Sequence, residues 1–175
     1  SNVAVSELVI GLTLNLLRKI NQADSATRNC QTNSLLIGEE LNNKTIGIIG
    51  LGKIGNKTAN LFSAFGCKVL AYQRKPINNP NVTQVTLNEL LSQSDIISLH
   101  IPYNEETYHF IDEDKINMMK KDAILINCAR GPVVDNIALA KALNEKRIKG
   151  AGIDVFDYEP PLNADYPLLN AKNTI

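Results

Sequence analysis

The chain has 175 residues, enough for one domain with a full hydrophobic core and too few for a second complete domain. Hydrophobic residues make up 44% and charged residues 21%, so we expect a soluble globule rather than a disordered chain. Eighteen basic and eighteen acidic residues give a formal net charge of +0, which provides no reason to expect nucleic acid or an anionic membrane as a partner.

The cysteines and the apolar N-terminal stretch bear on the compartment. Cys30, Cys67 and Cys128 are odd in number and form no C-x-x-C pair, so we expect free thiols in a reducing compartment. This predicts a cytoplasmic protein, and no metal site is expected. Residues 3–20 resemble a signal peptide, but their positive charges stand at the wrong end. The stretch is also shorter than the ~20 apolar residues of a membrane span.

The first 21 residues are expected to form an amphipathic helix. Its apolar positions follow helical spacing at Val5, Leu8, Val9, Leu12 and Leu16. This broad apolar face either packs against another domain or subunit or covers the protein's own core, and the spacing leaves both open. Residues 22–44 are expected to connect this helix to the rest of the chain, because residues 22–35 are rich in Asn, Ser and Thr.

From residue 45 onward, short β-rich runs alternate with helical patterns. Strands are expected at residues 45–49, 68–72, 96–101, 123–127 and 150–155. A first helix is expected at residues 54–65, with Gly66 as its C′ residue. A second is expected to begin at the capping box formed by Thr86 and Glu89. Asp112 and Asp135 are expected to cap two more, the last of which runs to about residue 146. This alternation predicts an α/β fold with a doubly wound parallel sheet, a Rossmann core over residues 45–175.

A glycine-rich turn joins the first expected strand to the first expected helix. Gly50, Gly52 and Gly55 form a G-x-G-x-x-G in the strand–turn–helix context that this motif requires. Gly50 permits the tight turn, Gly52 lets a pyrophosphate approach the backbone, and Gly55 lets the helix pack closely. The amides near Lys53 and Ile54 then face the phosphates. The motif predicts dinucleotide binding; the alternative is a glycine-rich turn with a purely structural role.

The end of the second expected strand bears on the form of the cofactor. A carboxylate about 20 residues after the glycines normally binds the ribose hydroxyls of NAD, but here Gln73 occupies that position, followed by Arg74 and Lys75. Without the carboxylate, Arg74 could hold a 2′-phosphate. We therefore expect NAD or NADP as cofactor, with a lean towards NADP. The alternative is that Arg74 and Lys75 are solvated while Gln73 still binds the ribose.

Three later blocks carry a family resemblance. They are DIISLHIP at 95–102, INCARGPVVD at 126–135 and GIDVFDYEPP at 152–161. With the glycine-rich turn before them, they resemble the D-isomer-specific 2-hydroxyacid dehydrogenases, which include phosphoglycerate dehydrogenase and hydroxypyruvate reductase. The resemblance covers nearly the whole chain. It implies the dinucleotide-binding domain of an oxidoreductase that transfers hydride between a nicotinamide cofactor and a D-2-hydroxy or 2-keto acid.

Two residues of these blocks are candidate catalytic groups. Arg130 follows a buried strand and should emerge at the crevice where α/β sheets bind ligands, and its planar fork suits a carboxylate or carbonyl oxygen. The resemblance implies that Arg130 orients the 2-keto acid and polarises its carbonyl. Pairing with a structural carboxylate is the alternative. The resemblance also implies that Glu159 hydrogen-bonds a catalytic histidine and favours its protonated form.

The same resemblance assigns further cofactor contacts. It implies that Ile101 and Pro102 border the adenosine, that Cys128, Ala129 and Arg130 border the nicotinamide end, and that Asp154 lies near the nicotinamide. For Ile101 and Cys128, ordinary core packing is a comparable alternative. His100 matches a family histidine that lines the cofactor crevice and is not the acid/base.

The resemblance also implies what lies outside these residues. The family's catalytic histidine follows a run that starts near residue 173, and neither His100 nor His109 aligns with it. We therefore expect a domain isolated from its substrate domain, which binds a dinucleotide and has no turnover of its own. A homodimer through this domain is expected by resemblance.

Two other functions compete with this interpretation. The same scaffold serves corepressors, so a non-catalytic NAD(H)-sensing interaction protein is one alternative. A methyltransferase that uses S-adenosylmethionine is another, although that cofactor carries no diphosphate for the glycine-rich turn to bind.

Overall fold

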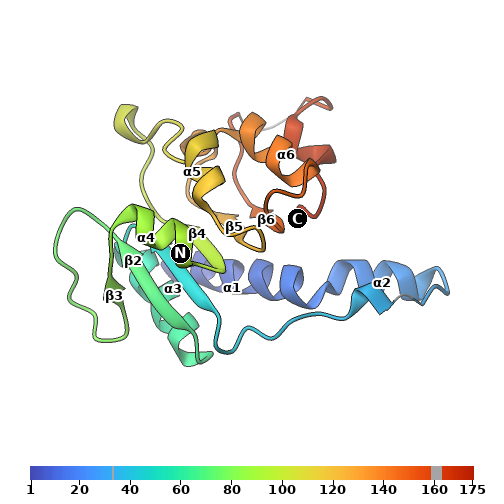
Figure 1. Cartoon of the computed structure of the whole chain (residues 1–175), viewed down its shortest axis with the longest axis horizontal. Helices are drawn as coiled ribbons and strands as arrows, with labels where there is room; N and C mark the ends of the chain where they lie inside the picture. Colours follow the sequence, from blue (N-terminus) through green and yellow to red (C-terminus); the bar gives the residue numbers. More distant parts are fainter. Residues whose placement is uncertain (33, 159–162) are drawn as a thin grey trace.

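The computed structural model describes residues 1–32, 34–158 and 163–175, and within them a parallel sheet organises the chain (Figure 1). The strand order is β3-β2-β1-β4-β5-β6 and every pair is parallel. The strands are β1 Thr45–Ile49, β2 Lys68–Tyr72, β3 Thr83–Gln84, β4 Ile96–Leu99, β5 Ile124–Asn127 and β6 Gly150–Ile153. The chain builds outward from β1 to β3 and then returns beside β1 at β4, which confirms the doubly wound fold and creates a switch point between β1 and β4.

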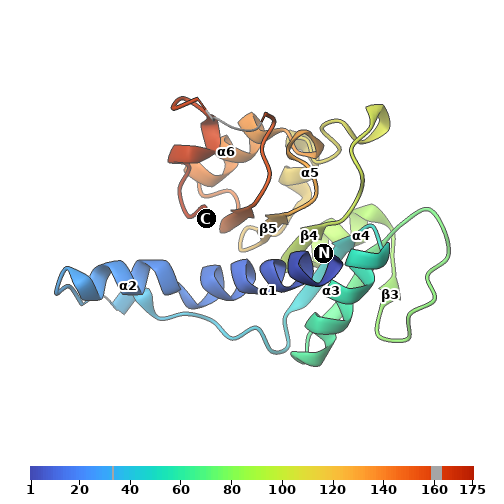
Figure 2. The same ribbon diagram turned by 180° about the vertical axis from the view of Figure 1, so that it is seen from behind.

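Helices cover both faces of the sheet (Figures 1 and 2). They are α1 Asn2–Arg18, α3 Lys53–Ala64, α4 Leu87–Gln93, α5 Glu113–Met118 and α6 Asn136–Asn144. Helix α2 Ile20–Arg28 instead extends away from the sheet and buries no side chain. Side chains alternate along each strand, so Ile46 and Ile48 pack with α1 and α3 on one face. Ile97 and Leu99 pack with α4, α5 and α6 on the other face. Strands β1, β4, β5 and β6 are therefore buried on both sides, as their continuous apolar sequences predict.

The expected cap residues are confirmed, but the single helix expected over residues 1–21 is wrong: Lys19 adopts a left-handed conformation (φ 55°), which ends α1 at Arg18 and starts α2 at Ile20. Gly66 has φ +79° after α3, a conformation that costs glycine little. Thr86 and Glu89 form the predicted capping box at α4. Asp112 caps α5 and Asp135 caps α6 by accepting hydrogen bonds from backbone N–H groups (both 3.0 Å).

The structure departs from the sequence-based expectation in several elements. Strands β4 and β6 end earlier than expected, at Leu99 and Ile153, close to where the neighbouring strands β1 and β5 also end. The edge strand β3 was not predicted because its two residues are polar and exposed. Residues 22–28, expected to be connection, instead belong to α2. This helix buries no side chain, so it has no apolar stripe to reveal it.

The buried face of α1 is rotated from the predicted stripe. Val9 and Leu16 are buried as predicted, but Leu8 is 38% exposed. Ser6 and Thr13 are buried instead, because their hydroxyl groups donate to backbone carbonyls one turn earlier (2.9 and 2.7 Å) and their small size permits close packing. The face carrying Val9 and Leu16 therefore covers the protein's own core. Packing of the exposed face against another subunit stays a prediction.

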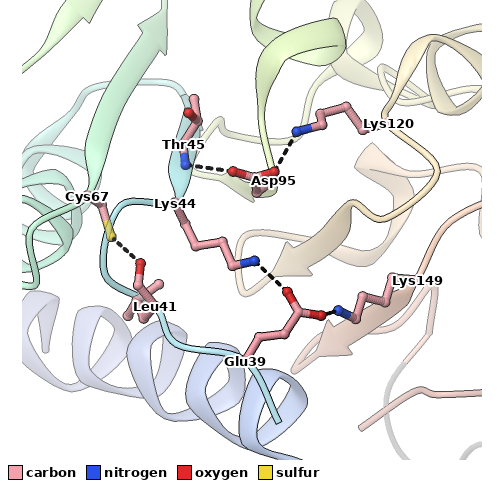
Figure 3. A network of polar contacts seen from close by, with 8 residues as sticks. All are labelled: Glu39, Leu41, Lys44, Thr45, Cys67, Asp95, Lys120 and Lys149. Atoms are coloured by element: carbon pink, nitrogen blue, oxygen red, sulfur yellow. Dashed lines mark hydrogen bonds and ion pairs between the residues drawn. The ribbon is translucent and has the colours of Figure 1, made fainter.

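A polar network fastens the connection after α2 to the edge of the sheet where the strands begin (Figure 3). Asp95 accepts hydrogen bonds from the first backbone N–H of β1 (2.8 Å) and from Lys120 (2.6 Å). Burial opposes ionisation of Asp95, but these hydrogen bonds outweigh it and lower the pKa of its carboxyl group. Glu39 forms ion pairs with both Lys44 and Lys149. The network lies at the opposite edge from the glycine-rich turn, so we assign it a structural role.

Candidate cofactor and active site

The glycine-rich turn lies between β1 and α3, at the edge of the sheet where the strands end. Gly50 has φ +91°, and a Cβ there would lie 2.7 Å from the carbonyl oxygen of His100. A Cβ on Gly55 would lie 2.1 Å from the carbonyl oxygen of Gly50. A Cβ on Gly52 would meet no atom within 4 Å. Gly50 and Gly55 are therefore required by the fold, whereas Gly52 leaves free space in front of the backbone.

Helix α3 begins at this turn without a side-chain cap. Gly52 is its N-cap residue, and no side chain of the described part of the chain accepts a hydrogen bond from the N–H groups of Lys53, Ile54 or Gly55. The first N–H groups of a helix have no partner within the helix, and its dipole places partial positive charge there. The start of α3 is therefore suited to bind an anion.

A first cavity of about 230 Å³ opens where β1, β2 and β4 end. It is lined by Gly50, Tyr72, Gln73, Arg74, Ile101, Pro102, Asn104, Glu106, Thr107 and Phe110. The Oε1 atom of Gln73 accepts a hydrogen bond from the Leu51 N–H (3.3 Å), so this side chain links the end of β2 to the glycine-rich turn. Arg74 forms an ion pair with Glu106 (Nη1 to Oε2, 3.2 Å).

A second cavity of about 490 Å³ adjoins the first. It is lined by Val5, Ile54, His100, Ile101, Pro102, Tyr103, Cys128, Ala129 and Arg130. Ile101 and Pro102 line both cavities. Gly50 of the glycine-rich turn lines the first cavity, and Ile54 at the start of α3 lines the second. The two cavities therefore meet at Ile101 and Pro102, and together they have the size typical of a small-molecule site.

Two titratable side chains of the second cavity, His100 and Cys128, are neutral at neutral pH. Burial lowers the pKa of His100 to about 4, and the His100 ring lies 2.9 Å (Nε2) from the hydroxyl of Ser98. Burial and the nearby charge of Asp154 raise the pKa of the Cys128 thiol to about 12. At neutral pH, Arg130 is thus the charged side chain among the described residues that line this cavity.

Arg130 lies on the loop after β5 and is exposed. Its Nη1 donates to the carbonyl oxygen of Ala129 (2.6 Å), and no carboxylate in residues 1–32, 34–158 or 163–175 pairs with it. The alternative in which Arg130 serves a structural ion pair therefore finds no support in this part of the chain.

A polar clamp joins the Arg130 loop to the loop after β6. Asn136 donates through Nδ2 to the carbonyl oxygen of Gly131 (3.2 Å) and to Oδ1 of Asp157 (2.9 Å). The Tyr166 hydroxyl donates to the other oxygen of Asp157 (3.1 Å). Burial and the charge of Asp157 raise the pKa of Tyr166, so it stays a donor at neutral pH. The clamp fixes the loop after β5, which carries Arg130, against the loop after β6, which leads towards Glu159. Glu159 itself lies outside the described residues.

The structure gathers most of the predicted cofactor residues and sets four apart. Gly50, Gln73, Arg74, His100, Ile101, Pro102, Cys128, Ala129, Ile54 and Arg130 line the two cavities. Gly52 and Lys53 are exposed at the start of α3, and Gly55 is buried beneath the turn. Asp154 is exposed after β6 and lines neither cavity.

The sequence interpretation missed several lining residues. Asn104, Glu106 and Thr107 come from the segment after β4, and Val5 comes from α1. One signal was available in part: Asn104 and Thr107 form a capping box around the short 3₁₀ helix η2, Glu105–Thr107. Val5 carried no such signal, because helical spacing alone does not say which distant loop a helix meets.

Other kinds of site find no basis in the described residues. No three His, Cys, Asp or Glu side chains there group as metal ligands. No helix in this part of the chain is both long and apolar enough to cross a bilayer.

A doubly wound sheet with an uncapped helix start and a glycine-rich turn at its switch point defines a nucleotide-binding α/β domain. Residues 10–175 match the family model described as "D-isomer specific 2-hydroxyacid dehydrogenase, NAD binding domain". The chain therefore belongs to the D-isomer specific 2-hydroxyacid dehydrogenases, as their NAD-binding domain. This confirms the family resemblance and leaves the methyltransferase alternative without support.

Characterised relatives agree with this family. A glyoxylate reductase of Thermofilum pendens is 45% identical over 98% of this chain and 53% of its own length. A D-3-phosphoglycerate dehydrogenase of Methanocaldococcus jannaschii is 39% identical over 100% of this chain and 34% of its own length. The chain thus spans between about a third and a little over half of these relatives.

Solved structures share the fold closely. An acyclic imino acid reductase in complex with NADPH and D-arginine superposes with a TM-score of 0.92 at 38% identity, over 100% of this chain and 56% of that one. A D-lactate dehydrogenase with NAD⁺ from Lactobacillus jensenii gives a TM-score of 0.88 at 37% identity, over 100% of this chain and 58% of that one. These two neighbours hold different forms of the cofactor.

Proposed function

We propose that the chain binds a nicotinamide dinucleotide across the two cavities, with the diphosphate at the start of α3. The observation that carries this proposal is the open space in front of Gly52, beside unpaired backbone N–H groups, in the turn whose residues Gly50 and Ile54 line the first and the second cavity. A diphosphate fits this position because it carries negative charge and needs close backbone approach.

The ends of the dinucleotide follow from the lining of each cavity. The first cavity lies at the end of β2, where the adenosine ribose binds in doubly wound domains, and Gln73 and Arg74 line it. The second cavity holds Cys128, Ala129 and Arg130, and we assign the nicotinamide to it. Asp154 lies beyond this cavity, near enough to Cys128 for its charge to act on the thiol.

In the whole enzyme we propose hydride transfer between this cofactor and a D-2-hydroxy or 2-keto acid. The nicotinamide, when bound, supplies or accepts the hydride. Arg130 binds the substrate carboxylate or carbonyl oxygen and orients it, and its fixed positive charge draws electron density from the carbonyl carbon. The neutral Cys128 thiol leaves this charge uncompensated, and the neutral His100 ring adds no second positive charge beside it. Glu159 is proposed to keep a catalytic histidine protonated.

We propose that the cofactor is NAD or NADP, with a lean towards NADP. Arg74 lines the first cavity and the carboxylate expected at the end of β2 is replaced by Gln73. Arginine forms bidentate hydrogen bonds with phosphate, which supports binding of a 2′-phosphate.

A homodimer through this domain is a further proposal. Val3, Leu8 and Ile20 leave 42%, 38% and 52% of their surfaces exposed along α1 and the start of α2. Burial of such apolar side chains in a partner stabilises a dimer. Light scattering should give a dimer mass that Leu8→Glu reduces to a monomer mass; a monomeric parent chain would refute the proposal. The cytoplasmic location stays a prediction.

A thermal-shift panel tests dinucleotide binding on this chain. NADH or NADPH at about 100 times Kd should stabilise the fold by ~2.7 kcal/mol, which raises Tm by roughly 5–11 °C at this length. S-adenosylmethionine should leave Tm unchanged. If neither dinucleotide raised Tm at millimolar concentration, the proposed function would be wrong.

The chemistry needs the whole protein. There, Arg130→Lys should lower kcat/KM for a 2-keto acid by orders of magnitude, because lysine keeps the charge and loses the planar fork. Turnover by the whole protein would also exclude the NAD(H)-sensing corepressor alternative. The expectation that these 175 residues have no turnover of their own stays a prediction, which an assay with glyoxylate or hydroxypyruvate checks.

A further inference from the structure

The ion pair between Arg74 and Glu106 spans two loops that are distant in sequence. Arg74 follows β2 and Glu106 belongs to η2, which follows β4, yet both line the first cavity. We propose, on the basis of the proposed dinucleotide site, that Glu106 selects between cofactor forms. It supplies from η2 the negative charge that the end of β2 lacks, and it competes with a 2′-phosphate for Arg74.

Local hydrogen bonds hold Glu106 in place. The side chain of Asn104 accepts from the N–H of Thr107 (3.1 Å), and the Thr107 hydroxyl donates to the carbonyl oxygen of Pro102 (2.7 Å). Glu106 lies between these anchored residues, and Pro102 itself lines both cavities. These hydrogen bonds fix the backbone of η2 independently of the ion pair, so Glu106 projects from an anchored segment that borders the cavity.

The backbone around Arg74 is held from the other side. Gln84 on β3 donates through Nε2 to the carbonyl oxygens of Gln73 (3.2 Å) and Lys75 (3.1 Å), the two residues that flank Arg74. Gln73 in turn accepts from the Leu51 N–H of the glycine-rich turn. Two anchored loops therefore present opposite charges at the same cavity.

The ion pair itself is easily broken. The side chains of Arg74 and Glu106 are 81% and 72% exposed, and exposed ion pairs contribute little to stability. A 2′-phosphate can therefore take Arg74 from Glu106, but it must then lie close to a carboxylate that repels it. A free 2′-hydroxyl meets no such repulsion and can donate a hydrogen bond to Glu106. Glu106 thus opposes the preference for NADP that Arg74 alone would create.

The chain offers a matched control in the adjacent residue. Glu105 carries the same charge and is also exposed, but it does not line the cavity. We would measure Kd for NADH and NADPH by fluorescence titration with the parent chain, Glu106→Gln and Glu105→Gln. Glu106→Gln should lower the ratio of Kd for NADPH to Kd for NADH by about tenfold, whereas Glu105→Gln should leave the ratio within twofold of the parent value.

A double-mutant cycle separates this inference from a general charge effect. Competition for Arg74 is lost in an Arg74→Gln background, so Glu106→Gln should change the ratio less there than in the parent chain; the change that remains measures direct repulsion of the 2′-phosphate by Glu106. A ratio unchanged in Glu106→Gln, or changed equally in Glu105→Gln, would overturn the inference while the dinucleotide site stood. Failure of the parent chain to bind either dinucleotide would instead overturn the proposed function.

Discussion

Replacing Gly52 by alanine separates the role of the glycine-rich turn in binding from its role in folding. A Cβ on Gly52 meets no atom within 4 Å, and its φ of −73° suits alanine. The neighbouring glycines Gly50 and Gly55 do not allow this experiment, because a Cβ on either would collide with backbone. The methyl group of Gly52→Ala would enter the space assigned to the diphosphate.

The expected effects on stability and on binding differ. Alanine is a poorer N-cap residue than glycine, but it also restricts the unfolded chain, so the two effects oppose each other. The free energy of unfolding should change by less than about 1 kcal/mol, which keeps Tm within ~4 °C. Crowding a methyl group against a bound diphosphate costs about 1–3 kcal/mol, which corresponds to a roughly 5- to 150-fold increase in Kd.

Calorimetric titration with NADH and NADPH, together with thermal melts, measures both quantities. Gly11→Ala is a matched control, because Gly11 lies exposed in α1 and a Cβ there also meets no atom within 4 Å. It should raise stability by up to ~1 kcal/mol and leave Kd unchanged. A Gly52→Ala variant that folds and binds both dinucleotides as tightly as the parent would refute the assignment of the diphosphate to this turn.

Other predictions concern stability, pH and thiol reactivity. Gly131→Ala should cost about 1–3 kcal/mol in urea unfolding, since its Cβ would lie 2.0 Å from the backbone after β6; unchanged stability would contradict the close packing. The pKa of Asp95 is lower in the folded state than in the unfolded state. Its carboxylate therefore stabilises the fold above about pH 4, and this stabilisation is lost as the pH falls through the folded-state pKa. Asp95→Asn, which loses the Lys120 ion pair, should therefore be less stable than the parent at pH 7, and this difference in stability should narrow as the pH falls below about 4; a difference independent of pH would contradict the reasoning. Mass spectrometry after iodoacetamide at pH 8 should find exposed Cys30 modified before Cys128, whose pKa is about 12; the reverse order would argue against a buried Cys128.

Features set by neighbouring residues could be predicted from the sequence. The strand β1, the cap residues Thr86 and Asp135, and the C′ residue Gly66 all depend on hydrogen bonds or backbone conformations within a few positions. Helix α2 and strand β3 escaped prediction because neither buries an apolar side chain, so their sequences carry no periodic signal.

By itself, the sequence determined the alternation of strands and helices, the family and the glycine-rich turn, since each is a pattern along the chain. Only the tertiary structure decided that Arg74 faces Glu106 and that Val5 reaches the cavity of Arg130. Arg74 and Glu106 meet because parallel strands end at one edge of the sheet, where the loops that follow them converge, whereas Val5 reaches its cavity because α1 packs against α3. Which loop residues then face one another depends on how the helices pack against the sheet.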